Sequence, residues 1–120
     1  MELSKQNRLI KLAHTKGYVV TNCGSKVHNK EGKELRLSKQ KRGGKLYFSF
    51  NIRPKGENPT RVYVHKLQAY QKFKEDMFKK GIVVRHMNDV SLDNTFINLK
   101  LGTQKQNMQD RARNERERES

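Results

Sequence analysis

The feature that most constrains the fold is a strand–turn–strand–helix pattern in the second half of the chain. The segment 82–87 (IVVRHM) reads as a short strand and is followed by a polar stretch, 88–95, and by the largely apolar run 96–101. Thr103 then offers an N-cap, and Gln106 stands three residues later, as in a capping box. Residues 82–110 are therefore predicted to form a β-hairpin followed by a helix.

The rest of the chain adds short helices and strands. Residues 4–16 can form a short helix, and residues 46–52 alternate apolar with polar side chains, as a half-buried strand does. Residues 61–64 predict another strand. A helix is expected over 65–81, with Gly81 at its C-cap. The predicted fold class is α+β.

Length and cysteine content limit what the chain can be. At 120 residues it is one domain at most, and with 32% hydrophobic residues its core is small. It has neither an apolar run that could span a bilayer nor an N-terminal secretory signal, which predicts a soluble, intracellular protein without a membrane partner. Cys23, the one cysteine, excludes an internal disulfide and a four-cysteine zinc site, so no structural zinc is expected.

The charge of the chain indicates a polyanionic partner. Twenty-seven Lys and Arg residues stand against twelve Asp and Glu, a net charge of +15. Residues 1–60 hold fourteen basic and four acidic residues, a net charge of +10. Such a surface attracts nucleic acid and releases counterions when it meets phosphate.

Three polar residues stand out on the hairpin–helix pattern: His86, Asn98 and Asn107, spaced by twelve and nine residues. The stretch 85–111, RHMNDVSLDNTFINLKLGTQKQNMQDR, resembles the motif of HNH endonucleases, in the variant whose third position is Asn. The segment that begins at His65, HKLQAYQKF, resembles the helix that precedes the motif in phage-type members. GYVVTNCGSKVH (17–28) resembles a β segment often found upstream in the same proteins.

The resemblance implies an N-terminal β-rich basic segment followed by a ββα-metal nuclease core. Residues 1–60 would contact DNA, and residues 61–120 would form the nuclease core with its C-terminal helix, in one compact unit. The implied partner is double-stranded DNA, which would be nicked or cleaved by phosphodiester hydrolysis. If a phage encodes the chain, it would act in the cytoplasm of the bacterial host cell.

The resemblance also assigns roles to the motif residues. His86 would act as general base, because the pKa of histidine lies near working pH. Asn98 would tie the hairpin turn and help to orient His86. Asn107 would bind a divalent cation, Mg²⁺ or Mn²⁺, and such a cation can polarise the phosphate and stabilise the departing 3′ oxygen.

One position departs from the common pattern. Many members carry Asp or His before the general base as a second metal ligand, whereas this chain has Arg85, which cannot bind a cation. Two interpretations are open: Arg85 contacts a DNA phosphate directly, or the site is weakened or inactive. His65 is interpreted as a packing or hydrogen-bonding residue, or alternatively as a phosphate contact.

Other residues complete the expected site. Asp89, Asp93 and Asn94 are interpreted as turn-formers, with a carboxylate near the metal as the alternative. A basic β surface is predicted to follow the DNA backbone. Its predicted members are Lys39, Lys41, Arg42, Lys45, Arg53 and Arg61. Arg85 is predicted as a further DNA contact.

Three functions compete. The leading one is a phage-type HNH endonuclease, for which nicking is the natural product of a monomer. The second is a non-cutting DNA-binding or regulatory protein derived from such a nuclease, which Arg85 favours. The third, an rRNA-binding protein, rests on charge alone. The target sequence and the oligomeric state are not encoded in any recognisable pattern.

Overall fold

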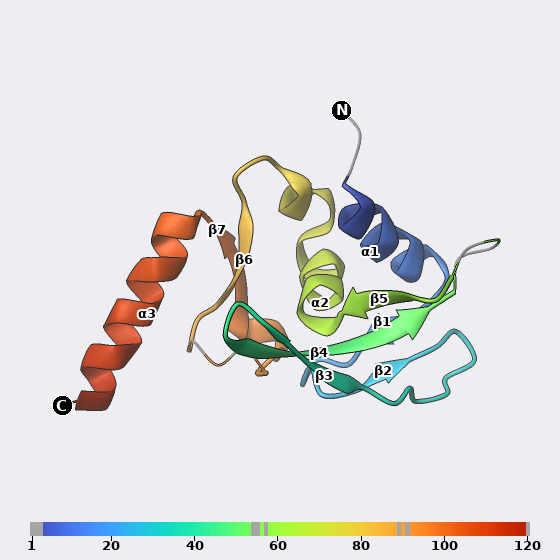
Figure 1. Cartoon of the computed structure of the whole chain (residues 1–120), viewed down its shortest axis with the longest axis horizontal. Coiled ribbons are helices and arrows are strands. Elements are labelled where there is room, and N and C mark those ends of the chain that lie inside the picture. The colour runs from blue at the N-terminus through green and yellow to red at the C-terminus, as the bar shows by residue number, and fades with distance from the viewer. Residues whose placement is uncertain (1–3, 54–55, 57, 89, 91, 120) are drawn as a thin grey trace.

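The computed structural model describes residues 4–53, 56, 58–88, 90 and 92–119, with only the backbone of Arg111 and of 114–119. Mixed helices and short strands follow one another along the chain, as predicted for an α+β fold (Figure 1). None of the helices in this part is long and apolar enough to span a membrane. The elements, in order, are α1 (Lys5–Thr15), β1 (Val19–Val20), β2 (Val27–His28), β3 (Ser38–Arg42), β4 (Lys45–Ile52), β5 (Thr60–Tyr63), α2 (Val64–Phe73), η1 (Lys74–Phe78), β6 (Val83–His86), η2 (Phe96–Asn98), β7 (Leu99–Gly102) and α3 (Gln104–Glu119).

The described strands form three small antiparallel sheets: β1–β2, β3–β4–β5 and β6–β7. The predicted hairpin and helix are confirmed as β6, β7 and α3. The return strand is shorter than residues 96–101, because Phe96–Asn98 form a 3-10 turn before β7 begins at Leu99. Along β4, Phe50 and Ile52 are buried as the alternation predicts, whereas Leu46 is 42% exposed.

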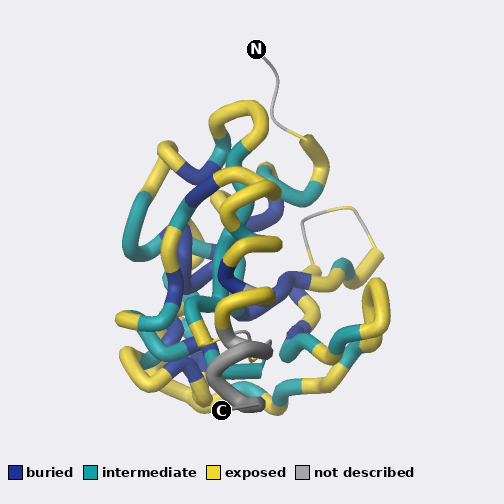
Figure 2. The backbone as a smooth tube through the Cα atoms, turned by 90° about the vertical axis from the view of Figure 1, so that its left-hand side faces the viewer, coloured by how far each residue is buried: buried dark blue, intermediate teal, exposed yellow. Residues whose placement is uncertain are grey.

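Helix α2 lies at the centre of the molecule and packs against α1, β1, β4, β5 and β7 (Figure 1). Its residues Val64, Leu67 and Ala69 are fully buried, together with Ile10 and Ala13 of α1. In contrast, the described residues of α3 are mostly exposed (Figure 2). The core therefore forms around α2, and α3 meets the rest of the chain along β6.

The helix expected over 65–81 ends at Phe73, so its predicted end at Gly81 is wrong. Lys74 takes a positive φ of 55°, which breaks the α-helical path and starts the 3-10 helix η1. The chain then folds back, and the rings of Tyr70 and Phe78 stack at 5.3 Å. Gly81 instead makes a tight turn, since Ile82 N donates to Lys79 O at 3.2 Å and Gly81 has a φ of 81°.

Candidate active site

The hairpin places His86 at the end of β6. His86 pairs with Leu99 across the β6–β7 ladder, and Met87 N donates to Asn98 O at 2.9 Å just beyond it. The loop between the strands folds back toward this end of the sheet. The imidazole therefore stands where a short, well-paired strand gives way to a polar loop.

Asn98 joins the two sides of that loop. Its Nδ2 donates to Asn88 Oδ1 at 3.0 Å and to the carbonyl of Asp93 at 2.9 Å, while its Oδ1 accepts from Asn88 N at 3.1 Å. The Asp93 carboxylate also accepts a hydrogen bond from Thr95 N at 3.1 Å, which stabilises the turn. Both oxygens of Asp93 bond neighbours within the loop, and Asp89 lies outside the described residues.

Asn94 holds the ring of His86, a contact that the sequence did not reveal. Nε2 of His86 donates to Asn94 Oδ1 at 3.1 Å. In the neutral imidazole this bond puts the proton on Nε2, so that Nδ1 is the nitrogen that can accept another proton. The sequence marked Asn94 only as a turn-former, because nothing in the local pattern shows which of several loop amides reaches back to the histidine.

The position of Asn94 is fixed by distant parts of the chain. The residue is 1% exposed, and Gln68 of α2 donates to its carbonyl oxygen at 3.2 Å. Gly24, which precedes β2, lies against the Asn94 backbone so closely that a Cβ there would sit 2.1 Å from the carbonyl carbon. The orientation of His86 thus depends on packing between the N-terminal segment, α2 and the hairpin loop.

If His86 is the general base that the resemblance implies, Asn94→Ala should lower the cleavage rate by about 10²-fold, because a misplaced base loses rate out of proportion to its displacement. Asn94→Asp keeps an oxygen acceptor and should retain more of the rate. Both variants would be compared with wild type by single-turnover cleavage, with urea unfolding as the check on folding. If Asn94→Ala cleaved DNA at the wild-type rate, the hydrogen bond to Asn94 would not be needed to hold His86 in place.

The rings of Tyr47, His65 and His86 lie next to one another, and we call them the aromatic group. The His65 ring lies 5.6 Å from that of His86, and Tyr47 lies 4.8 Å from His65 and 6.4 Å from His86. Burial holds the pKa of His65 well below its usual value, and the nearby His86, Lys66 and Arg42 lower it further. His65 is therefore neutral at pH 7, and its ring contacts agree with the packing interpretation.

Asn107 reaches the same region from α3. The predicted capping box is present: Gln106 N donates to Thr103 Oγ1 at 3.2 Å, and Thr103 N donates to Gln106 Oε1 at 2.8 Å. Asn107 lines a cavity of about 510 Å³ that Tyr47 and His65 also line. His86 is not among the lining residues, but its ring contacts both Tyr47 and His65.

Arg85 forms an ion pair with α3. Its Nε and Nη2 donate to the two carboxylate oxygens of Asp110 at 2.8 and 2.9 Å, and the two side chains are 14% and 5% exposed. Hydrogen bonding to Arg85 lowers the pKa of Asp110, so the carboxylate is ionised at neutral pH. The guanidinium is therefore occupied by Asp110, whereas one interpretation from the sequence had it contacting a DNA phosphate.

The predicted basic β surface is divided between two faces. In antiparallel pairs, opposed residues share a face, and β3–β4 pairs Arg42 with Lys45, but Lys39 with Phe48 and Lys41 with Leu46. Lys39 and Lys41 therefore lie on the side that buries the core. The other side, which we call the cleft face, carries Arg42, Lys45, Tyr47 and Arg61.

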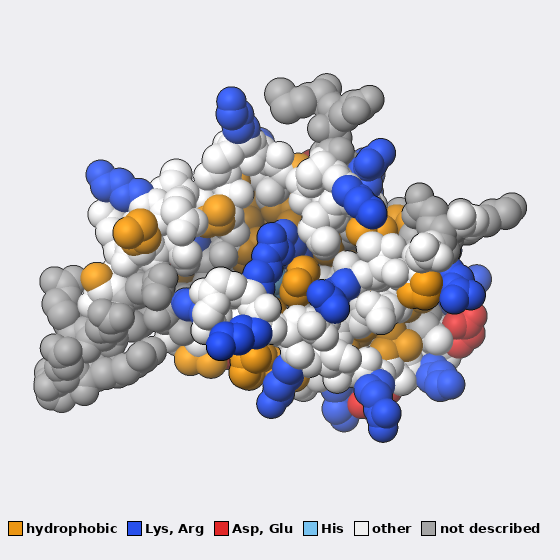
Figure 3. All heavy atoms as spheres, viewed as in Figure 1, with side chains coloured by type: hydrophobic (Ala, Val, Ile, Leu, Met, Phe, Trp, Pro, Cys, Tyr) orange, Lys and Arg blue, Asp and Glu red, His pale blue; other side chains and the backbone are white. Residues whose placement is uncertain are grey.

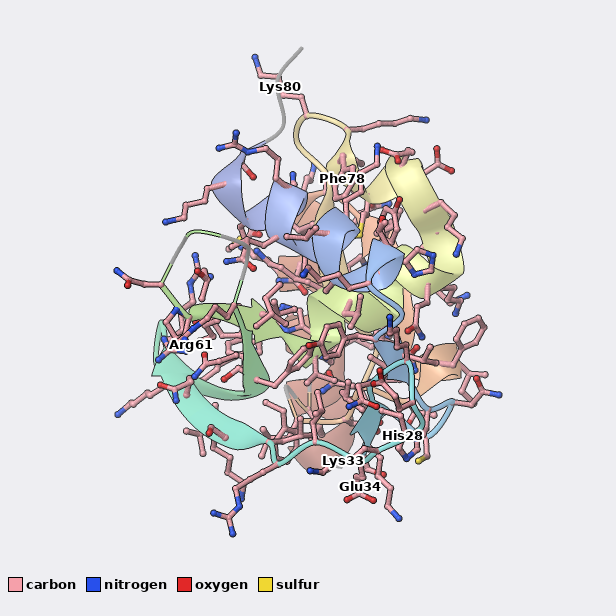
Figure 4. The ribbon with its side chains drawn as sticks, turned by 90° about the vertical axis from the view of Figure 1, so that its right-hand side faces the viewer. His28, Lys33, Glu34, Arg61, Phe78 and Lys80 are labelled. Atoms are coloured by element: carbon pink, nitrogen blue, oxygen red, sulfur yellow. The ribbon has the colours of Figure 1, made fainter. Side chains whose placement is uncertain are left out.

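The single surface predicted from the sequence is thus corrected by the strand register. Arg42 and Lys45 line the cavity. Arg61 projects from the same sheet (Figure 4), and Arg53 follows β4 and is exposed. In the view of Figure 3, Lys and Arg side chains gather around a hollow between the β6–α3 part and the α1–β5 part. Whether these side chains bind DNA stays a prediction.

The described residues give a metal ion few protein ligands. No group of three or more His, Cys, Asp or Glu side chains in this part of the chain could hold one. Asn107 supplies one amide oxygen, and the position before His86 holds a cation. Mg²⁺ keeps several waters and commonly shares phosphate oxygens. A single amide oxygen fits an ion that keeps most of its waters, and it does not fit a closed site made by protein alone.

The β6–β7–α3 unit, with a histidine at the strand end and an asparagine on the helix, defines an α+β protein built on a ββα unit. No family model matches the sequence. A protein of Acanthamoeba polyphaga mimivirus, described as an uncharacterized HNH endonuclease, is 36% identical over 112 residues, which cover 89% of this chain and 27% of that protein.

A solved structure agrees with this match. It concerns DNA binding and cleavage by the HNH homing endonuclease I-HmuI, and it aligns with a TM-score of 0.54 and 28% identity over 80% of this chain and 52% of that one. The chain is thus similar to HNH endonucleases in sequence and in fold. It spans 27% of the length of the viral relative and about half of the solved chain.

Proposed function

We propose that this chain is a metal-dependent endonuclease that nicks or cleaves double-stranded DNA by phosphodiester hydrolysis. The observation that carries the proposal is the placement of His86: it ends a strand of the ββα unit, Asn94 fixes its ring, and it adjoins the cavity that Asn107 lines. The similarity to HNH endonucleases supports the same reaction, and the cations around the cavity favour a polyanionic substrate.

His86 acts as the general base in this mechanism. Its Nδ1 removes a proton from a water molecule while Nε2 stays bonded to Asn94. The oxygen of that water forms a bond to phosphorus, and the bond from phosphorus to the 3′ oxygen breaks. The products are a 3′ hydroxyl, which takes up a proton, and a 5′ phosphate. Neutral His65 beside His86 adds no second positive charge to the group.

Asn107 would hold the divalent ion, Mg²⁺ or Mn²⁺. When bound, such an ion polarises the phosphate and stabilises negative charge on the departing oxygen. The cleft face, most of which belongs to residues 1–60, would bind the DNA backbone, while residues 61–120 would carry the nuclease core. If a phage encodes the chain, it acts in the cytoplasm of the bacterial host cell.

The test separates binding from cutting in one tube. A labelled duplex is first bound in EDTA and followed by fluorescence anisotropy. Mg²⁺ is then added in excess, and the strands are resolved on a denaturing gel. We expect binding before Mg²⁺ and cut strands only after it. Binding without cutting, on any duplex including the native locus, would contradict the proposed nuclease.

That outcome would instead support the second candidate, a DNA-binding or regulatory protein of the same family that does not cut. One observation favours this candidate: Arg85 stands at the position of a usual metal ligand and is paired with Asp110 rather than free to change partner. The candidate predicts that wild type and His86→Ala bind DNA equally and that neither cuts it.

Asn107→Ala should abolish cleavage at low Mg²⁺ and recover part of it when Mg²⁺ or Mn²⁺ is raised. Losing even an indirect partner of a metal site costs roughly 10-fold or more in affinity, and Asn107 would be a direct ligand. The measurement is cleavage rate against metal concentration. Gln104→Ala, which changes another α3 residue that lines the cavity, is the matched control. Equal metal dependence for the Asn107 variant and wild type would remove Asn107 from the metal site.

A further inference from the structure

The cavity beside His65 is strongly cationic. Arg42, Lys45, Lys66 and Lys79 line it, and no Asp or Glu is among the described residues that line it. Lys79 pairs with Asp76 at 3.2 Å on the surface, where the Lys79 side chain is 72% exposed. The other three cations come from the β3–β4 turn and the start of α2, so they approach the cavity from two separate elements.

Lys66 is the unusual member of this group. Its side chain is partly buried, and burial together with the nearby charge of Arg42 lowers its pKa. Among the residues that the structure describes, the Lys66 side chain has no hydrogen bond and no ion pair. Burying a charge costs free energy unless a partner is supplied, and a second cation nearby adds to that cost. An anion bound between Lys66 and Arg42 would offset both.

The backbone points to the same ligand. Lys66 is the third residue of α2, and Tyr63 at the N-cap makes no side-chain hydrogen bond to the first turn. The first N–H groups of a helix lack partners within the helix, and the helix dipole places partial positive charge there. Such a terminus binds phosphate and other anions readily. Here the terminus and the unpaired lysine lie at the same cavity.

The surroundings identify the source of the anion. His65, next to Lys66, contacts the ring of His86, and Tyr47 of the cleft face contacts both histidines. A phosphate held here would thus lie one contact layer from the proposed general base. It would belong to the strand being cut, at a position flanking the scissile phosphate.

We propose that Lys66, Arg42 and the first turn of α2 form a binding site for a DNA backbone phosphate that flanks the one being hydrolysed. This inference rests on the proposed nuclease function for the identity of its ligand. The site positions the strand, so that His86 meets the scissile phosphate and not a neighbouring one. The sequence did not mark Lys66, because a single lysine at the start of a helix is ordinary until the fold shows what surrounds it.

The test compares Lys66→Met with Lys33→Met in the full chain. Lys33 is exposed in the connection after β2, beside Glu34 and His28, at an edge of the molecule (Figure 4). Each variant loses one positive charge and keeps a long side chain. Duplex affinity would be measured by fluorescence anisotropy in EDTA over a range of salt, with urea unfolding as the check that both variants fold.

We expect Lys66→Met to bind the duplex about 10-fold more weakly and to reduce the slope of log K against log salt by about 0.9, the loss of one phosphate contact. Lys33→Met should keep the wild-type slope. Inorganic phosphate at constant ionic strength should raise the Tm of wild type and not that of Lys66→Met. Equal slopes for the two variants would overturn the proposal. A phosphate effect on Tm without a change in slope would also overturn it, since the site would then bind free anions and not DNA.

Because these measurements are made in EDTA, they do not depend on cutting. A wild type that binds DNA through Lys66 but never cuts would contradict the nuclease and leave the phosphate site standing. A wild type that cuts, with Lys66→Met unchanged in affinity and slope, would contradict the phosphate site alone.

Discussion

His86→Ala will lower the cleavage rate by roughly 10²–10⁴-fold while leaving DNA affinity nearly unchanged. A general base contributes mainly in the transition state, where the proton leaves the attacking water, so its loss lowers the rate more than it lowers binding. The ring of His86 is held at the end of β6 by Asn94 and is not part of the cationic lining of the cavity. The measurement is the single-turnover rate at saturating protein, with affinity in EDTA.

The matched control is His28→Ala, which removes a partly buried histidine of β2 that lies outside the aromatic group. His28→Ala should cut at the wild-type rate. If His86→Ala cut as fast as wild type, the base would have to be another group. If it lost affinity and rate together, His86 would be a DNA contact and not a base.

Arg85→Ala will lower the free energy of unfolding by about 3 kcal/mol or more, the low end of the range for removing one partner of a buried ion pair. Asp110 would stay ionised and nearly buried without its two hydrogen bonds from Arg85. Arg113, 3.8 Å from Asp110, can compensate in part, which sets the expectation at the low end. Urea unfolding at pH 7 measures the change.

The sign of the pH dependence follows from the pKa of Asp110. Arg85 holds that pKa below its ordinary value in the folded chain. The pair therefore contributes stability at neutral pH, and this contribution is lost as the pH falls through the pKa of Asp110 in the folded chain. Wild type and Arg85→Ala should accordingly differ most near pH 7 and least in acid.

The double variant Arg85→Met with Asp110→Leu is the control, because replacing both members with apolar side chains leaves no unpaired charge and should recover most of the stability. Arg85→Asp would place a second carboxylate against Asp110, so we expect it to unfold more readily rather than to gain a metal ligand. Wild-type stability for Arg85→Ala would show that the pair contributes little.

The sequence predicted the parts of the fold that depend on local pattern. The hairpin, its helix and the capping box at Thr103 were predictable because strand alternation, polar turns and caps are encoded within a few residues. The end of α2 was not, because helical spacing continues past Phe73. What stops the helix is the return of Met77 and Phe78 to the core, a tertiary effect.

The candidate site shows the same division. The spacing of His86, Asn98 and Asn107 marks the ββα unit, but the contacts that fix His86 and neutralise Arg85 join residues far apart along the chain or on different elements. Arg85 meets Asp110 across twenty-five residues, and Gln68 reaches the Asn94 backbone across twenty-six. The division of the basic residues between two faces depends on the β3–β4 register, which lysine and arginine counts do not contain.

The most direct test of the nuclease assignment is conversion of supercoiled plasmid by purified wild type and His86→Ala, each with Mg²⁺ or with EDTA. We predict that wild type with Mg²⁺ gives nicked circles, and that EDTA or the substitution prevents this. Because the 3′ oxygen departs, the nicks should carry a 3′ hydroxyl and a 5′ phosphate and be resealed by DNA ligase. Nicks that form equally in EDTA or with His86→Ala, or no nick in any DNA supplied, would contradict hydrolysis at this site.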